Sequence, residues 1–303
     1  MSATLEMRFD HRPSTAAYML RALHPLPGLR RAGSFPPVSV SWRQHRVDRR
    51  HLTEFLRLTG LRADQGLPVL YPHVFGFPLQ MVILTHPAFP MPIWNSLQIR
   101  NHLIRHRAIP ADAVLDLETR MAGQRILEKG AEVDLHTCMR TRDEPVWESL
   151  NTFYYRGRYG EPGPASPLAR APAVGDQVLA QWHMAAGVGW RFGGLTGDYN
   201  GIHWSRWYAR LFGFRQAFHH PQLVLGQCMA RLPAPDPSEA QRLDAWLKGP
   251  VYYDSDVRLR ATAKSGGTAF ALVAAGEERP AILGCWRQAG TSESLLLQEA
   301  FAE

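Results

Sequence analysis

The stretch Phe192-Gly-Gly-Leu-Thr-Gly-Asp198-Tyr-Asn200-Gly-Ile-His203 is the most informative part of this chain. Its Thr-Gly step is typical of a helix end, because glycine adopts the left-handed conformation in which many helices stop. Asn200 and the glycine after it predict a turn directly beyond that end. The turn delivers a carboxylate and an imidazole five residues apart, and such a pair can hold a water and move its protons near neutral pH.

The chain as a whole has the composition of a globular protein. It has 303 residues, of which 45% are apolar and 20% charged, and this length suits two domains of ordinary size. No apolar run is long enough to cross a bilayer, and the first thirty residues lack the apolar segment of a signal peptide. We therefore expect a chain that does not insert into membranes.

Three cysteines, at positions 138, 228 and 285, are too few and too scattered to form a disulfide framework. A reducing, cytoplasmic setting is the expectation that follows. The net charge of +7 predicts an acidic or phosphate-bearing partner. We expect no nucleic-acid binding, because the nearest basic cluster, 43–50, is interrupted and lacks interleaved aromatic residues.

Proline and glycine interrupt the chain near its middle. Residues 157–175 are so rich in both that they exclude a helix or a central strand, and we interpret them as a linker. The two sides of this linker look alike when one is laid over the other. We predict an N-terminal domain over 1–156, the linker over 157–175, and a C-terminal domain over 176–303.

Each side follows one plan. A short alternating segment leads to a Leu-Thr-Gly, an apolar helix follows behind a proline-containing entry, and alternating strands close the domain. This is an α+β layout in which a sheet wraps around a central helix. The matched segments are 38–42 with 178–182, Leu58-Thr-Gly60 with Leu195-Thr-Gly197, helix 74–84 with helix 223–232, and strands 114–119, 132–137 and 147–155 with strands 257–263 and 268–273.

The motif around Asp198 resembles the MaoC-like acyl dehydratases and the (R)-specific enoyl-CoA hydratases, whose pattern is Gly-Asp-x-Asn-Pro-Ile-His. The resemblance implies a tandem, or double, hotdog fold, each half an antiparallel sheet wrapped around a central helix. Glycine replaces the family's proline, which loosens the turn without removing a reactive group. The matching positions are Gly197, Asp198, Asn200, Ile202, His203, Ala209, Gly213-Phe214, His220 and the Pro-Val-Tyr at 250–252.

By this resemblance Asp198 and His203 are the catalytic pair. The implied reaction is the reversible hydration of a trans-2-enoyl thioester to an (R)-3-hydroxyacyl thioester, carried on coenzyme A or an acyl carrier protein. No further cofactor and no metal are implied, and pairing of two chains as a homodimer stays open. The matching neighbours favour this interpretation over a turn that uses Asp and Asn only for its own backbone.

The resemblance also implies substrate-binding positions: Asn200 in the turn, and His220, Pro221 and Gln222 at the start of the second central helix. Pro221 stands where the family has a glycine whose N–H binds the thioester oxygen. Proline has no N–H, so the Gln222 N–H is the expected substitute. If no donor replaces it, the alternative is a non-catalytic acyl-thioester-binding protein.

The first half lacks the reactive pair. Leu61 follows its Leu-Thr-Gly, and Gly66 stands five residues later, so one site per chain is expected. By resemblance such a half shapes the acyl tunnel, with 71–84 as a candidate wall. A hotdog thioesterase is the second alternative, but it would need a carboxylate on the central helix, and 223–232 has none.

Three other groups of residues have competing interpretations. His219 and His220 could bind a metal with His203, but adjacent histidines point in different directions and we favour helix-entry residues. We interpret His102 and His106 as part of a polar sheet surface. The aromatic residues after the turn either cover the site or pack the following helix: Trp204, Trp207 and Tyr208.

Overall fold

The computed structural model describes residues 5–22, 37–290 and 293–296. Its strands form one eleven-stranded sheet in the order β1-β2-β4-β5-β6-β3-β8-β11-β10-β9-β7. Apart from the parallel β1–β2 pair, neighbouring strands are antiparallel. The strands are β1 (Leu5–Phe9), β2 (Val38–Arg46), β3 (Ser96–Arg105), β4 (Val114–Leu127), β5 (Gly130–Thr141), β6 (Glu144–Arg156), β7 (Val178–Met184), β8 (Gln241–Leu247), β9 (Ser255–Lys264), β10 (Gly267–Ala274) and β11 (Ile282–Gln288).

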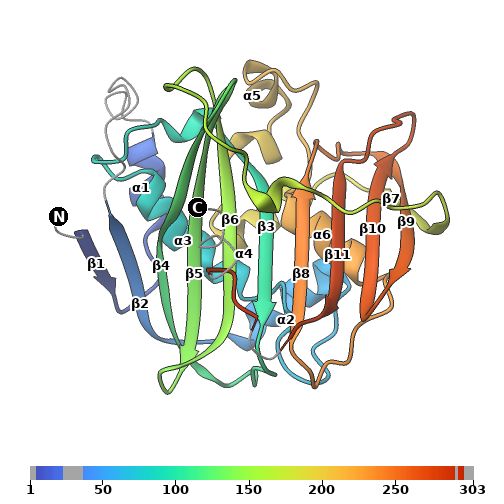
Figure 1. The fold of residues 1–303 in the computed structure, drawn as a ribbon, viewed down its shortest axis with the longest axis horizontal. Coiled ribbons are helices and arrows are strands. Elements are labelled where there is room, and N and C mark those ends of the chain that lie inside the picture. Colours follow the sequence, from blue (N-terminus) through green and yellow to red (C-terminus); the bar gives the residue numbers. More distant parts are fainter. Residues whose placement is uncertain (1–4, 23–36, 291–292, 297–303) are drawn as a thin grey trace.

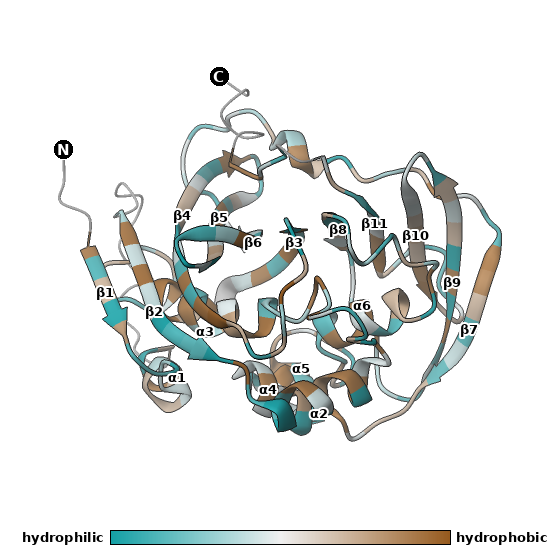
Figure 2. Cartoon of the chain, turned by 90° about the horizontal axis from the view of Figure 1, so that it is seen from below, coloured by the Kyte–Doolittle hydropathy of each residue, from teal (hydrophilic) through white to brown (hydrophobic). Residues whose placement is uncertain are grey.

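The helices lie on the concave side of the curved sheet, as Figure 2 shows. They are α1 (Thr15–Ala22), α2 (Arg49–Thr59), α3 (His73–Leu84), α4 (Gly189–Thr196), α5 (Arg206–Leu211) and α6 (Pro221–Met229). Both α3 and α6 are buried nearly all round, which explains why their sequences are apolar on every face. They are the two predicted central helices, and the double-hotdog prediction is confirmed (Figure 1).

The two halves meet edge to edge. β3 of the first half pairs with β8 of the second from Arg100↔Trp246 to Arg105↔Gln241, so the two predicted sheets become one. Neither β8 nor β11 is among the strands predicted from the sequence. The second central helix ends at Met229, three residues before the predicted end, because the N–H groups of Arg231 and Leu232 turn back to Cys228 and Met229.

Both Leu-Thr-Gly segments end a helix, as predicted for the second. Gly60 after α2 and Gly197 after α4 adopt the left-handed conformation, with φ of 76° and 83°. Residues 157–175 contain no strand and one short 3₁₀ turn, Pro167–Ala169. Among the described residues, no helix is long and apolar enough to cross a membrane.

The segment 157–175 crosses the outer face of the sheet in front of β3 and β8 (Figure 1). The indole N–H of Trp246 on β8 donates to the Leu168 carbonyl at 2.9 Å. Further along the chain, the Leu295 N–H donates to Glu148 on β6 at 3.2 Å. These two segments keep water from side chains on the outer face that would otherwise be exposed.

The prediction of a polar sheet surface at His102 and His106 is therefore wrong in one respect. Both belong to the β3 region, but His102 is fully buried and its Nδ1 lies 2.7 Å from Asp244. His106 is half-buried against Glu148, 3.3 Å away. The polar outer face is an internal network of ion pairs, because the linker and the C-terminal segment cover it.

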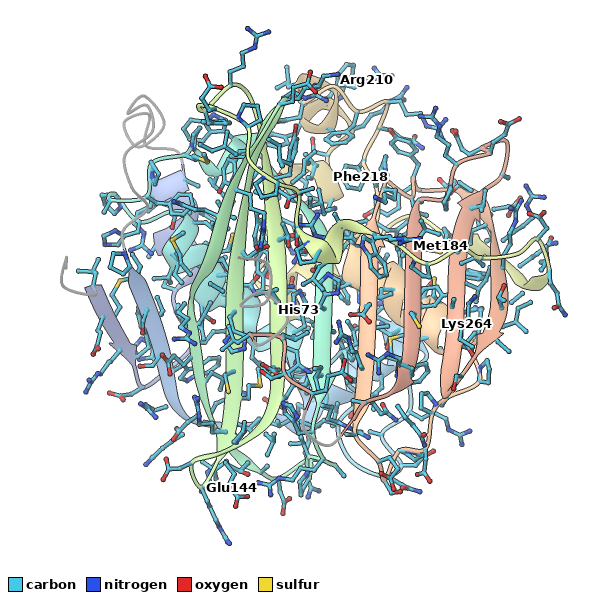
Figure 3. The ribbon with its side chains drawn as sticks, viewed as in Figure 1. His73, Glu144, Met184, Arg210, Phe218 and Lys264 are labelled. Atoms are coloured by element: carbon cyan, nitrogen blue, oxygen red, sulfur yellow. The ribbon has the colours of Figure 1, made fainter. Side chains whose placement is uncertain are left out.

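Arg100 and Glu132 form a deeply buried ion pair in this network. Two guanidinium nitrogens lie 2.9 and 2.5 Å from the two carboxylate oxygens, and both side chains are about 95% shielded from water, with 4% and 6% exposed. Arg107 and Glu144, by contrast, pair at 2.6 Å on the surface. Glu144 lies at the far end of the molecule from Phe218, which borders the cavity described below (Figure 3).

Candidate active site

The turn after α4 is built by its own side chains. The Asp198 N–H donates to the Thr196 hydroxyl at 3.1 Å, and one Asp198 carboxylate oxygen accepts the Asn200 N–H at 3.2 Å. The Asn200 side chain in turn accepts the Ile202 N–H and begins a 3₁₀ turn, Gly201–His203. Short polar side chains that bond their neighbouring backbone are what makes such a turn form locally.

His203 and Asp198 face each other across a short gap. The His203 Nδ1–H donates to the Phe218 carbonyl at 3.0 Å, which leaves the Nε2 lone pair directed at Asp198 Oδ2, 3.6 Å away. Burial is the largest effect on the pKa of His203 and lowers it, although Asp198 and the carbonyl act in the other direction. The neutral imidazole and the carboxylate both accept hydrogen bonds, so the pair is suited to bind a hydrogen-bond donor such as a water or a hydroxyl group.

His220 contacts both members of this pair. Its Nε2–H donates to the Asp198 carbonyl at 2.9 Å, and its ring stacks on His203 with 3.9 Å between centroids. Burial, and then the nearby His203, lower the pKa of His220 well below its usual value. His220 thus lies against the pair, as the sequence suggested, but the cavity wall includes His219 instead.

The candidate ligand atoms of Asp198, His203 and His220 lie within 4.8 Å of one another. A metal would nevertheless compete with the bond that His220 Nε2–H makes to the turn, because a protonated nitrogen has no lone pair for a ligand bond. His219 takes no part, since its Nε2 lies 3.4 Å from the Met184 carbonyl and its ring packs on Tyr253. That the site holds no metal stays a prediction.

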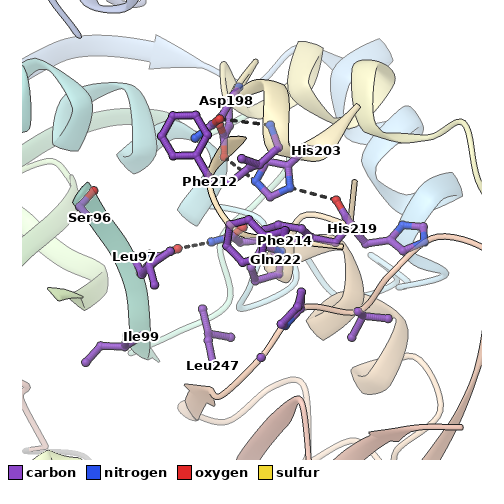
Figure 4. A pocket seen from close by; sticks show the side chains of 18 of the residues that line it. Ser96, Leu97, Ile99, Asp198, His203, Phe212, Phe214, His219, Gln222 and Leu247 are labelled. Carbon is purple, nitrogen blue, oxygen red and sulfur yellow. Dashed lines mark hydrogen bonds and ion pairs between the residues drawn. The ribbon is translucent and has the colours of Figure 1, made fainter. Parts of the chain in front are cut away.

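A cavity of about 410 Å³ opens beside the pair. Asp198 and His203 lie at one end of the view in Figure 4, and Ile99 and Leu247 lie at the other. Both halves of the chain contribute to its wall, which is mostly apolar. The residues from the first half include Phe77, Met81, Leu97, Ile99 and Phe153, and those from the second include Phe212, Phe214, Phe218, Val224 and Leu247.

Two members of the predicted wall 71–84 line this cavity, Phe77 and Met81. The contribution of β3 and of the segment 212–214 was not predicted from the sequence, because only tertiary packing brings them to the turn. Tyr208 lines the cavity, whereas Trp207 is 76% exposed. The aromatic residues after the turn therefore have different places, and one of them lines the cavity.

The start of α6 reaches the same cavity. Pro221 is the first residue of the helix, where a missing N–H costs nothing. The first helical bond of α6 runs from the Val224 N–H to the His220 carbonyl, at 3.2 Å. Within the described residues the Gln222 N–H has no backbone or side-chain acceptor, so it can donate out of the helix N-terminus. The Gln222 side chain donates to Gln98 at 2.6 Å and lies 3.2 Å from His73.

Buried histidines make the fold sensitive to acid. Burial lowers the pKa of His45, His73 and His219 from 6.5 to about 4, and lowers that of His203 and His220 as well. Below pH 6.5 these histidines bind protons in the unfolded chain but stay neutral in the folded chain. The free energy of unfolding therefore falls as the pH drops.

We expect the free energy of unfolding to fall by at least about 3 kcal/mol between pH 7 and pH 4.5. Urea unfolding followed by tryptophan fluorescence at several pH values measures it. The His73→Gln variant should show a shallower slope over the same range. A wild-type profile that is flat from pH 7 to pH 4.5 would contradict the expectation.

No protein-family model matches the chain. It is 26% identical over 259 residues to 3-hydroxyacyl-thioester dehydratase X of Mycobacterium tuberculosis, covering 84% of this chain and 91% of that protein. The crystal structure of HtdX of Mycobacterium tuberculosis superposes with a TM-score of 0.70 at 22% identity, over 83% of this chain and all of that one. The MaoC-like dehydratase of Phytophthora capsici gives 0.67 at 18% identity, over 86% and 97%.

Fold and site together define a double-hotdog protein in which the Asp198–His203 pair faces a cavity shared by the two halves. The comparisons confirm the predicted resemblance to the MaoC-like dehydratases. Fold, motif and curated relative agree on a hydro-lyase, an enzyme that adds or removes water.

Proposed function

We propose that this chain catalyses the reversible hydration of a trans-2-enoyl thioester to an (R)-3-hydroxyacyl thioester. The observation that carries the proposal is the Asp198–His203 pair, two hydrogen-bond acceptors 3.6 Å apart on the wall of an apolar cavity. The cavity suits an acyl chain, and the pair suits a water, which can donate to both acceptors, or a 3-hydroxyl group, which donates to one of them. The 3-hydroxyacyl-thioester dehydratase with which this chain shares 26% identity supports the same substrate class.

In this mechanism the pair removes a proton from the bound water as its oxygen attacks the β-carbon of the enoyl group. A proton returns from the pair to the α-carbon, so the pair ends as it began and one water has been added. Negative charge that builds on the thioester oxygen is stabilised by the Gln222 N–H at the N-terminus of α6. Dehydration uses the same steps in reverse.

No redox cofactor or metal takes part in this mechanism, and coenzyme A or an acyl carrier protein carries the substrate. Neither central helix contains a carboxylate, which argues against a thioesterase of the hotdog type. The three cysteines are free, and we propose a reducing, cytoplasmic setting for the enzyme.

The test follows the loss of the enoyl-thioester absorbance with crotonyl-, octenoyl- and dodecenoyl-CoA and with the same acyl groups on an acyl carrier protein. Turnover with an (R)-3-hydroxyacyl product, identified by chiral chromatography, supports the proposal. Release of free thiol without hydration would identify a thioesterase. Acyl-thioester binding with no turnover on either carrier would identify a binding protein.

Leu247 lies at the end of the cavity away from Asp198 (Figure 4) and should limit the length of the acyl chain. We expect Leu247→Trp to lower kcat/KM for dodecenoyl-CoA at least about tenfold, because the larger ring takes space that the long chain needs. Turnover of crotonyl-CoA should change little. Leu247→Met conserves volume and is the matched control. An equal loss on both substrates would contradict this placement of the acyl chain.

A further inference from the structure

Three side chains of the first half hold the backbone directly before Asp198. The Arg12 guanidinium donates to the Leu195 carbonyl at 2.9 Å, and His51 Nε2 lies 2.9 Å from the same oxygen. The Tyr18 hydroxyl donates to the Gly197 carbonyl at 2.7 Å. These contacts join positions that are 144 to 183 residues apart in the chain.

The accepting carbonyls belong to the C-terminal end of α4, where a helix leaves its last carbonyls without partners. The positive charge of Arg12 is also favourable there, because the C-terminus is the negative end of the helix dipole. The next carbonyl, that of Asp198, accepts from His220. Within four residues, three carbonyls are therefore fixed by side chains from outside the turn.

The donors are themselves held in place. The Tyr71 hydroxyl lies 2.9 Å from His51 Nδ1, so Tyr71 donates to Nδ1 and His51 Nε2–H is left to donate to Leu195. Thr15 lies 3.0 Å from the Tyr18 hydroxyl. Tyr18 and Tyr71 are at most 2% exposed, so the contacts sit in the protein interior and not on a mobile surface.

The side chains of Tyr18 and Arg12 pack closely against Gly197. A β-carbon at this position would lie 2.4 Å from the Tyr18 hydroxyl and 3.0 Å from an Arg12 nitrogen. Because Gly197 precedes Asp198 directly, a shift of these side chains moves the carboxylate relative to His203. No role was predicted from the sequence for the segment around α1.

We propose that Arg12, Tyr18 and His51 are positioning residues for catalysis, which set the carboxylate of Asp198 against the imidazole of His203. This inference rests on the proposed hydration reaction. It gives the first half a second role besides lining the cavity, because this half lacks a reactive pair but holds the turn that carries one. These residues touch neither the substrate nor the reacting atoms.

The test removes single hydroxyl groups. Tyr18→Phe and Tyr71→Phe keep the buried rings but release the turn, and each should lower kcat about 10- to 100-fold, the loss expected for a misplaced reacting group. KM should stay within about twofold, since the acyl cavity is unchanged. Tyr154→Phe is the control, because its hydroxyl also donates to a backbone carbonyl, that of Lys129 at 2.7 Å, but away from the site.

Two further variants separate positioning from general stability. Arg12→Lys, which can still donate to Leu195, should retain more activity than Arg12→Met. In an Asp198→Asn background, Tyr18→Phe should lower the residual rate no further, because both changes act through one carboxylate. Full additivity in the double variant, or losses equal to that of Tyr154→Phe, would overturn the proposal.

Hydrogen exchange tests, independently of activity, whether these side chains hold the turn that carries Asp198. Amides of residues 198–203 should exchange faster in Tyr18→Phe and Tyr71→Phe than in wild type, and remain unchanged in Tyr154→Phe. A wild-type protein without turnover would overturn the proposed function, and exchange alone would then test whether the turn is held. Unchanged exchange in both tyrosine variants would show that these side chains do not fix the turn.

Discussion

Asp198→Asn is expected to lower kcat for enoyl-thioester hydration about 1,000-fold, within the range that positioned acid–base groups contribute. Asparagine has nearly the same shape, and its side-chain oxygen can still accept the Asn200 N–H that builds the turn. What it loses is the negative charge and the ability to exchange a proton. The amide would also offer an N–H to His203 Nε2 and occupy the lone pair that water needs.

The measurement is steady-state hydration of crotonyl- and octenoyl-CoA, with acyl-CoA binding by calorimetry. Binding should stay within about threefold of wild type, because the cavity wall is unaltered. Asp236→Asn is the matched control, since Asp236 also accepts the N–H two residues on, that of Ser238 at 2.9 Å, in an exposed turn. Equal activity of wild type and Asp198→Asn would remove Asp198 from the mechanism.

Glu132→Gln is expected to reduce the free energy of unfolding by about 3 to 5 kcal/mol, the usual cost of breaking a buried ion pair. The change leaves the Arg100 guanidinium, which is 4% exposed, without its bidentate carboxylate. Water cannot replace that partner, because the covered outer face of the sheet excludes it. Most of the loss is the cost of an uncompensated buried charge and not the strength of the pair itself.

Urea unfolding provides the measurement, with Glu144→Gln as the surface counterpart. Glu144 pairs with Arg107 where both side chains are about half exposed or more, so its loss should cost less than about 1 kcal/mol. The double replacement Arg100→Met/Glu132→Leu should recover much of the stability, since it removes both charges. A loss in Glu132→Gln no larger than in Glu144→Gln would show that water reaches the pair.

The segment around Asp198 was predictable because its rules are local. Gly197 ends α4, Asn200 begins the next turn, and His203 closes it, so all three act within a few residues of each other. The same holds for the start of α6, where Pro221 occupies the first helical position. The roles of these residues in catalysis remain predictions until the variants are measured.

The strands at the junction of the halves were not predictable in the same way. β8 reads Gln241–Leu247 and carries Arg242 and Asp244, which look like surface residues in the sequence. They are buried, because β8 pairs with β3 and the linker crosses over both. The alternation of residues along a strand predicts which side chains share a face of the sheet. Whether that face is exposed to solvent depends on a segment far away in the chain.

The resemblance to a known family implied the double-hotdog fold. Local sequence patterns specified an α+β plan that repeats in two halves, a proline- and glycine-rich segment between them, and a turn that presents Asp198 and His203 together. Those features follow from backbone preferences and hydrogen bonds between near neighbours. Tertiary packing determines which apolar side chains line the cavity and brings Arg12, Tyr18 and His51 into hydrogen-bond contact with the backbone before Asp198. Such contacts join residues more than a hundred positions apart, and no local rule specifies them because they exist only once the two halves have packed.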